Sequence, residues 1–302
     1  MGQVRNQVTP QVQPALARLA LFVAGHVAVL GLVYLLSVHT VTGRRLADAS
    51  LRGAIAVRPL LRGTVQQVLD VVSVASLLGA VAVVAVIALV RLARLEGLVA
   101  IGILAGANVS TWLLKNVLLT RPDLGLSEVA PATLNSLPSG HATAAFSALA
   151  ALLFVTTRRW RDLTATVGAG YAALTGVATM LAGWHRAADS AAAFLVVGAW
   201  AGLGAAVLVF AGTPTRDQAG PEPRSRPVWW LIRSALASLA LAAVLAAGLV
   251  LASLAPGNAV GSAVAFLAGC LFVVASAAAV TVGVLEVLRI ADERPAAPTA
   301  GL

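Results

Sequence analysis

The stretch PSGHATAAFSALAALLFVTT, residues 138–157, decides what kind of fold this chain adopts. It contains no Asp, Glu, Lys or Arg, and a helix of about 20 such residues is long enough to cross the hydrocarbon core of a bilayer. This stretch contributes the span 139–157. Together with it, apolar spans of comparable length occupy residues 16–38, 68–90, 97–119, 139–157, 163–184, 188–211, 228–252 and 260–288. Since every backbone polar group in lipid needs an internal partner, the sequence predicts an all-α, polytopic bundle of about eight transmembrane helices.

The composition agrees with a membrane protein. Of the 302 residues, 59% are hydrophobic and 11% are charged, whereas soluble domains carry roughly 25% charged residues. The net charge of +9 comes from arginines near span ends, which suits attraction to anionic lipid head groups. No basic run with interleaved aromatic residues is present, so the expected partners are membrane lipids and not nucleic acids. The sequence specifies no oligomeric state.

The distribution of arginines predicts the topology. With eight spans, thirteen arginines fall on one face of the membrane, and five fall on the other in the long connection 39–67, once Arg121 and Arg186 are set aside as candidate site residues. Because cationic residues near span ends are kept on the cytoplasmic side, both termini are predicted to be cytoplasmic, in a multi-pass protein of the cell membrane. The connection 39–67 is expected on the outer side, either in the membrane interface or as a solvated loop.

A connector rich in Pro and Arg suggests how the chain is divided. The N-terminal segment has no cleavage-site pattern, so the first span is expected to be retained. We expect a cytoplasmic N-terminal segment (1–15), a six-helix membrane core (16–211), a cytoplasmic linker (212–227), an additional two-helix membrane segment (228–288) and a cytoplasmic tail (289–302).

The start of the span at residue 139 is suited to binding an anion. Ser139 follows Pro138 and is a favourable helix N-cap, and the first backbone N–H groups of a helix attract phosphate oxygens. Gly140 lets a ligand approach the backbone closely, and His141 lies next to it. The alternative is that Ser139 only caps the helix and that His141 lies in the interface.

Two further groups of polar residues are expected on the same side of the membrane. Lys115, the only lysine, lies near the end of a span, six residues before Arg121. Ionisable groups at such depth usually face a polar cavity, although a lysine can also extend to the head groups. His185 and Asp189 are four residues apart, so on a helix they share a face and the carboxylate can orient the imidazole. Alternatively, Asp189 caps the helix and His185 is interfacial.

The turns between the third and fourth spans and between the fifth and sixth spans lie on one side, so these groups can converge. Metal-free phosphoryl transfer requires two histidines, a carboxylate and several groups that bind the phosphate anion. One histidine attacks phosphorus, the other protonates the leaving group, and the cations hold the phosphate oxygens. No cluster of Cys, His or carboxylates argues for a metal, so no cofactor is expected.

These residues resemble the motifs of the type 2 phosphatidic acid phosphatases, also called lipid phosphate phosphatases and related to vanadium haloperoxidases. The family pattern is KxxxxxxRP, then PSGH, then SRxxxxxHxxxD. The matches are Lys115 with Arg121 and Pro122, then Pro138 to His141, then His185 with Asp189. The resemblance covers residues 65 to 211, approximately, and implies a helical core.

The resemblance also implies a role for each matched residue. His185 would be the nucleophile that forms a phosphohistidine, Asp189 its orienting partner and His141 the general acid. The phosphate would be bound by Lys115, Arg121, Ser139 and Gly140.

The chain departs from the family pattern in two places. Lys115 is one residue closer to Arg121 than in the pattern, and the Ser-Arg pair is replaced by Ala178 and Thr179. A phosphate-binding arginine is therefore missing from its expected position. Arg186 is the nearest candidate to replace it, because its planar fork suits two phosphate oxygens. The alternative is that this arginine anchors the turn to lipid head groups.

The resulting hypothesis is a metal-independent membrane phosphatase that hydrolyses a lipid phosphate or diphosphate at an outward-facing site. A polyprenyl diphosphate or a phosphatidate-type lipid is the expected substrate. One alternative is a catalytically silent relative that binds or moves anionic lipids, which the missing Ser-Arg pair favours. Another is a secondary transporter, which is disfavoured because the charged groups lie at span ends and not midway.

Overall fold

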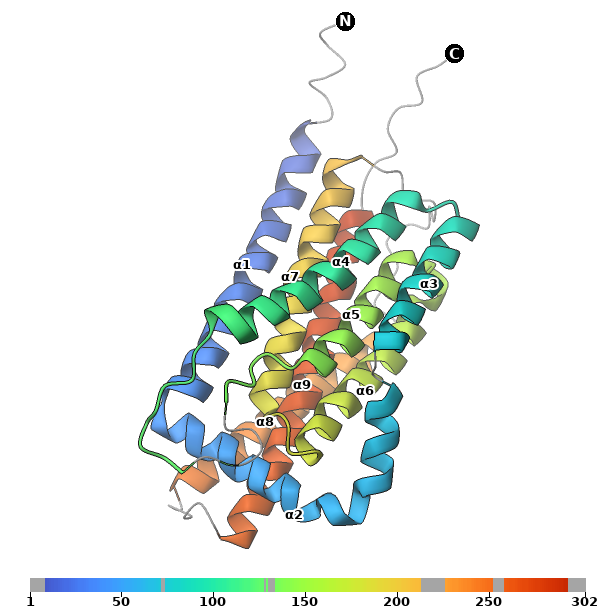
Figure 1. Cartoon of the computed structure of the whole chain (residues 1–302). Coiled ribbons are helices and arrows are strands. Elements are labelled where there is room, and N and C mark those ends of the chain that lie inside the picture. Colours follow the sequence, from blue (N-terminus) through green and yellow to red (C-terminus); the bar gives the residue numbers. More distant parts are fainter. Residues whose placement is uncertain are drawn as a thin grey trace, which may run out of the picture.

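The computed structural model describes residues 9–71, 74–127, 129, 134–212, 226–251 and 258–292, and this part of the chain is helical and contains no strand (Figure 1). The predicted all-α membrane bundle is thus confirmed. The elements are α1 (Thr9–His39), α2 (Val41–Val71), α3 (Val74–Val90), α4 (Arg94–Leu113), the π-helical turn η1 (Leu114–Leu118), α5 (Gly140–Val155), α6 (Arg158–Leu181), α7 (Ala187–Phe210), α8 (Arg226–Leu251) and α9 (Ala259–Asp292).

Each of the eight predicted spans corresponds to a helix, with ends that differ by a few residues. Among the described residues, six helical stretches are long and apolar enough to cross a membrane: Val12–His39, Arg94–Leu118, Arg158–Leu181, Ala187–Phe210, Pro227–Val250 and Ala259–Asp292. The other two apolar stretches, Leu78–Val90 of α3 and Gly140–Val155 of α5, are shorter. The second span was predicted to start at residue 68, but the residues up to Val71 belong to α2.

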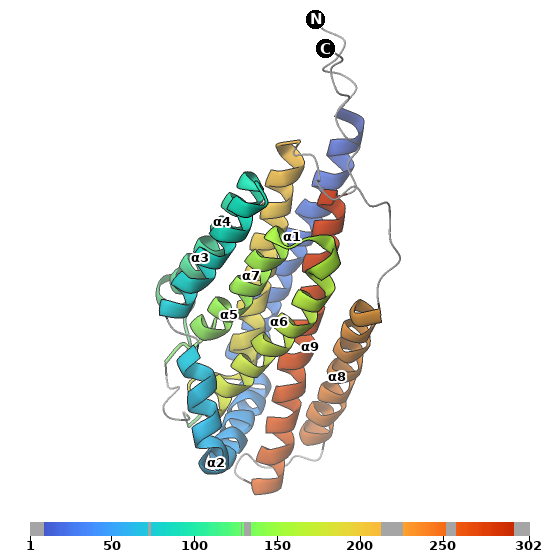
Figure 2. The same ribbon diagram turned by 90° about the vertical axis from the view of Figure 1, so that its right-hand side faces the viewer.

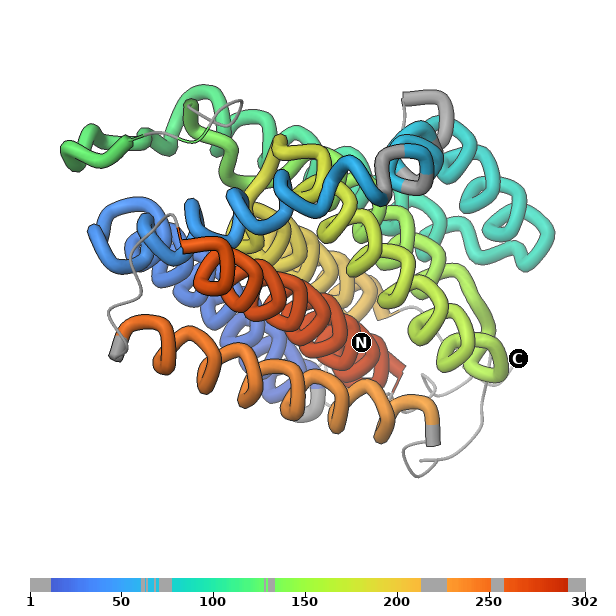
Figure 3. Tube along the Cα trace, turned by 90° about the horizontal axis from the view of Figure 1, so that it is seen from below, coloured from blue at the N-terminus to red at the C-terminus, as the bar shows by residue number. Residues whose placement is uncertain are grey.

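The connection 39–67, for which we considered an interfacial position or a solvated loop, is helical over most of its length and forms α2. This helix crosses one end of the bundle and changes direction along its length (Figures 1 and 3). It contains Pro59, and a proline inside a helix is a common cause of such a bend. Arg44 and Asp48 on one side are buried, whereas the neighbouring Arg45 is exposed. A helix with one buried and one exposed side, lying across the bundle end, suits the membrane interface.

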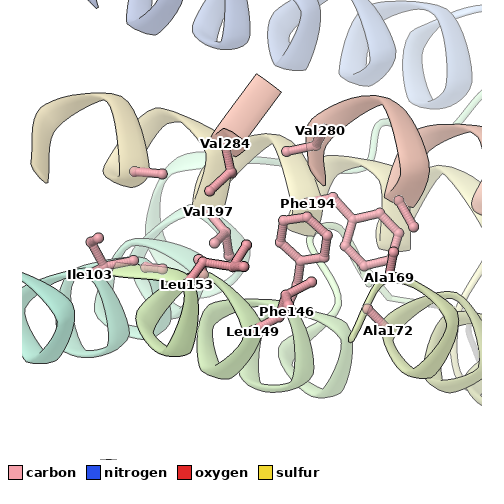
Figure 4. Close-up of a cluster of buried hydrophobic side chains, with 14 of the residues drawn as sticks. Ile103, Phe146, Leu149, Leu153, Ala169, Ala172, Phe194, Val197, Val280 and Val284 are labelled. Atoms are coloured by element: carbon pink, nitrogen blue, oxygen red, sulfur yellow. The ribbon is translucent and has the colours of Figure 1, made fainter. Parts of the chain in front are cut away.

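The core of the bundle lies where α5, α7 and α9 meet. The rings of Phe146 and Phe194 pack with their centroids 4.9 Å apart, and Leu149, Val197 and Val280 surround them (Figure 4). In a membrane, helices associate through such close packing and not through transfer of apolar surface out of water. This core therefore fixes α5 relative to α7, the two helices at whose starts the predicted motifs lie.

Helix α9 takes part in this core, whereas α8 lies on the outside. α9 packs against α7 and α2, and α8 packs mainly against α9 (Figure 2). The assignment of residues 228–288 to an additional segment concerns domain organisation and stays a prediction. Spatially, α9 supports the same elements that carry the predicted site.

Candidate active site

The PSGH sequence forms the start of α5. Ser139 is the N-cap: its Oγ accepts a hydrogen bond from the backbone N–H of Ala142 at 3.3 Å, which confirms the predicted cap. A Cβ added at Gly140 would meet no atom within 4 Å, so the space beside the first turn of the helix is open. An anion in this space would meet the positive end of the helix dipole and the first N–H groups.

The turn before α7 brings a histidine and a carboxylate together. Nδ1 of His185 lies 3.2 Å from Oδ2 of Asp189, and the same oxygen accepts a hydrogen bond from the backbone N–H of Arg186 at 2.9 Å. The helix begins at Ala187, so Asp189 is at its third position and is not the N-cap. With Nδ1–H donating to the carboxylate, Nε2 carries the lone pair that a nucleophile needs.

One backbone hydrogen bond joins the two motifs. The N–H of Ser139 donates to the carbonyl of Asp189 at 2.9 Å. In the first turn of α5, His141 packs against the ring of Trp184, with centroids 5.4 Å apart, and lies within electrostatic range of His185. The structure therefore brings both predicted catalytic histidines and the aspartate into one site.

Lys115 lies in η1, the π-helical turn that ends α4. Its backbone carbonyl accepts a hydrogen bond from the side-chain amide of Asn135 at 3.0 Å, and the same amide donates to the carbonyl of Leu119 at 3.1 Å. Asn135 thus fastens the end of η1 to the segment that leads into α5. Lys115 is half-buried and within electrostatic range of His141, which favours a position facing the site over extension to the head groups.

Arg121 and Arg186 converge on a carboxylate that the motifs do not include. Nε of Arg186 donates to Oδ1 of Asp48 at 2.7 Å, and Nη2 of Arg121 lies 3.5 Å from the same oxygen. Nη1 of Arg186 also donates to Oγ of Ser136 at 3.3 Å. Only 2% of the Arg186 side chain is exposed, which argues against its alternative role as an anchor to lipid head groups.

Asp48, Ser136 and Arg44 also belong to this cluster, although the sequence motifs do not predict them. Arg44 is buried and donates to the carbonyl of Pro122 at 2.6 Å, which holds the Arg121–Pro122 segment against α2. The missed signal is helical spacing: when residues 41–71 are treated as a helix, Arg44 and Asp48 are four positions apart on one face. For Ser136 no signal is visible apart from its closeness to PSGH.

Thr179 stands at the position of the missing family arginine and adds no positive charge to the site. Thr179 is buried and its hydroxyl donates to the carbonyl of Gly176 within α6 at 2.8 Å. Its own backbone carbonyl accepts a hydrogen bond from the N–H of His185 at 3.3 Å. Among the described residues, no group of three or more His, Cys, Asp or Glu side chains is arranged to hold a metal ion.

A known family matches the part of the chain that carries the predicted motifs. Residues 96–213 match the PAP2 superfamily. No curated protein and no solved structure matches the chain. The matched part runs from α4 to the end of α7 and includes every site residue that the motifs predicted, whereas α1, α2 and α9 lie outside it. The segment that carries the candidate active site is thus similar to the PAP2 superfamily.

Proposed function

We propose that the chain is an integral membrane phosphatase that hydrolyses a lipid phosphate or diphosphate through a phosphohistidine intermediate. The observation that carries the proposal is the contact of 3.2 Å between His185 Nδ1 and Asp189 Oδ2, in the turn before α7, which a backbone hydrogen bond from Ser139 joins to the start of α5. The match of residues 96–213 to the PAP2 superfamily supports phosphatase-type activity. The long apolar helices support a substrate that reaches the site from the membrane.

The proposed reaction has two steps. Nε2 of His185 attacks phosphorus, and the bond to the lipid oxygen breaks as His141 protonates that oxygen. His141 then removes a proton from a water molecule, which attacks the phosphohistidine and releases inorganic phosphate. Asp189 stabilises the charge that the ring of His185 gains in the first step. The phosphate oxygens are held by the start of α5 and by the cations Lys115, Arg121 and Arg186.

Phosphate release from detergent-solubilised protein tests this function. A panel of phosphatidate, phosphatidylglycerophosphate and polyprenyl diphosphate separates the substrate classes. We expect release from at least one lipid, unchanged by a chelator and inhibited by vanadate, which mimics five-coordinate phosphorus. A silent relative would bind these lipids without releasing phosphate, and activity that a chelator abolishes and a divalent cation restores would contradict the metal-free mechanism.

The site is proposed to face outward, which predicts the sidedness of two turns. The thirteen-to-five distribution of arginines supports cytoplasmic termini, and α1 begins and α9 ends away from the end that α2 crosses (Figure 1). A reporter inserted after Gly125 should report the outside, and one inserted after Thr157 should report the inside. The reverse result would overturn both the topology and the preference for an outer-face lipid.

Arg186 is proposed to replace the missing phosphate-binding arginine. Arg186→Ala should lower kcat/KM by about 100-fold, corresponding to about 3 kcal/mol for a charge-assisted contact. Arg186→Lys should recover only part, because an ammonium lacks the planar fork that contacts Asp48 and Ser136. The measurement is steady-state kinetics on protein shown to be folded. Arg159→Ala, at an exposed arginine of α6, is the matched control, and near-normal kinetics for Arg186→Ala would discard this role.

A further inference from the structure

We infer that Asp48, in a helix outside the segment matched to the family, is a positioning residue of the active site. Its carboxylate holds the guanidinium groups of Arg121 and Arg186 in place and, through the second of these, helps to fix the nucleophilic histidine. The inference deepens the proposed function and rests on it. Three observations support it: a shared carboxylate, a chain of hydrogen bonds and a tight contact between α2 and α9.

The shared carboxylate solves an electrostatic problem. Two buried guanidinium groups in one site repel each other and have both lost hydration. Oδ1 of Asp48 lies 2.7 Å from Nε of Arg186 and 3.5 Å from Nη2 of Arg121, and the three side chains are between 2% and 5% exposed. A carboxylate between the two cations offsets their repulsion and fixes both before a phosphate arrives. Preorganised donors of this kind need no rearrangement during the reaction.

The chain of hydrogen bonds runs from Asp48 to the nucleophile. Asp48 accepts from Nε of Arg186, and Nη1 of Arg186 donates to Oγ of Ser136 at 3.3 Å. The backbone N–H of Arg186 donates to the carboxylate of Asp189 at 2.9 Å, and this carboxylate lies 3.2 Å from Nδ1 of His185. Because every link is buried, a change at Asp48 propagates to the imidazole.

The contact between α2 and α9 argues for a fixed carboxylate and against one that swings away to admit phosphate. A Cβ added at Gly53 would lie 2.1 Å from the backbone oxygen of Ser262. A Cβ added at Gly269 would lie 2.3 Å from Oγ of Ser50. At Gly53 the added Cβ would meet backbone, so only glycine permits the approach there, which places α2 and Asp48 at a set depth over the site. Helix α9 thereby acquires a role in catalysis although it lies outside the matched segment.

Asp48→Asn tests the inference because it keeps the size of the side chain and removes its charge. We expect kcat/KM to fall by at least about 30-fold, as for a broken buried ion pair. Asp70→Asn, at an exposed aspartate of the same helix, is the matched control and should retain full activity. Asp48→Asn with normal kcat/KM would overturn the inference.

A combined variant separates positioning from loss of the fold. If Asp48 acts through Arg121 and Arg186, then adding Asp48→Asn to a variant that already carries Arg121→Gln and Arg186→Gln should lower kcat/KM by no more than about threefold further, because coupled residues are not additive. A purely structural role predicts that these variants melt at lower temperature while the folded fraction keeps its specific activity. That result would overturn the inference. A combined variant whose loss of kcat/KM equals the product of the separate losses would overturn it as well.

A second variant leaves the chemistry of Asp48 unchanged and moves its helix. Gly53→Ala should force α2 away from α9 and lower kcat/KM, because the added Cβ meets backbone and not a flexible side chain. Gly63→Ala is the matched control: it lies on the same helix, and a Cβ there would meet no atom within 4 Å. Equal activity of the two folded variants would overturn the role assigned to the contact between the helices.

Binding of orthovanadate distinguishes a failure of this inference from a failure of the proposed function. Calorimetry of vanadate binding requires no turnover. Asp48→Asn should bind vanadate at least about 10-fold more weakly than the wild-type chain, since its arginines are no longer preorganised. A wild-type chain that binds vanadate but releases no phosphate contradicts the proposed function alone. Equal or tighter binding by Asp48→Asn overturns the role of Asp48, whatever the turnover.

Discussion

Replacing His185 with alanine should reduce phosphate release by about 10⁴-fold or more, because the variant lacks the atom that bonds to phosphorus and removal of a nucleophile disables the whole catalytic unit. Rapid quenching of the wild-type chain with labelled substrate should trap an acid-labile phosphoprotein. The same experiment on His185→Ala should trap none. His39→Ala, at an exposed histidine at the end of α1, should behave like the wild-type chain.

The partner of this histidine should show a smaller effect. Asp189→Asn removes the charge that lies 3.2 Å from Nδ1 and can hold the ring in the wrong tautomer, so we expect a loss of about 10²- to 10⁴-fold. The phosphoprotein should still form, but slowly. Normal turnover by His185→Ala in folded protein, or a stable adduct on another residue, would contradict a phosphohistidine intermediate.

The apolar helices could be predicted because their signal is local, whereas α2 could not. Length and lack of charge identify a span such as 188–211 without knowledge of its neighbours. The segment that forms α2 contains arginines, three glycines and Pro59, which are features of loops. Its helix is held by contacts with other elements, such as the close approach of Gly53 to Ser262 of α9. Tertiary contacts of this kind override local preference.

The same distinction applies to the site. His185 and Asp189 could be paired from the sequence by assuming helical spacing; the contact forms although α7 begins at Ala187 and His185 lies in the turn before it. Arg186 could be proposed as a site residue from the sequence. The sequence did not reveal the partner that allows its guanidinium group to be buried. That partner is Asp48, which lies 138 positions away in the chain. No spacing rule connects residues so distant, and only the packing of α2 across the bundle end brings them together.

His141 should be distinguishable from His185 by its dependence on the leaving group. A lipid alkoxide is a poor leaving group and needs a proton from a general acid, so His141→Ala should lower kcat/KM on the lipid by about 10³-fold. An activated aryl phosphate such as p-nitrophenyl phosphate leaves as a stable anion without that proton. Formation of the phosphohistidine from the aryl substrate should therefore be nearly normal in His141→Ala, whereas it is lost in His185→Ala.

The second step exposes the other role of His141. If this residue also activates water, the phosphohistidine formed from the aryl phosphate should accumulate in His141→Ala, because its hydrolysis lacks a general base. Stopped-flow measurement should then show a burst of nitrophenol close to the enzyme concentration, followed by slow turnover. His141 packs beside Trp184 and interacts electrostatically with His185, which supports the proposal that it serves both steps. An equal loss of the burst rate and of lipid turnover would show that His141 holds the phosphate and transfers no proton.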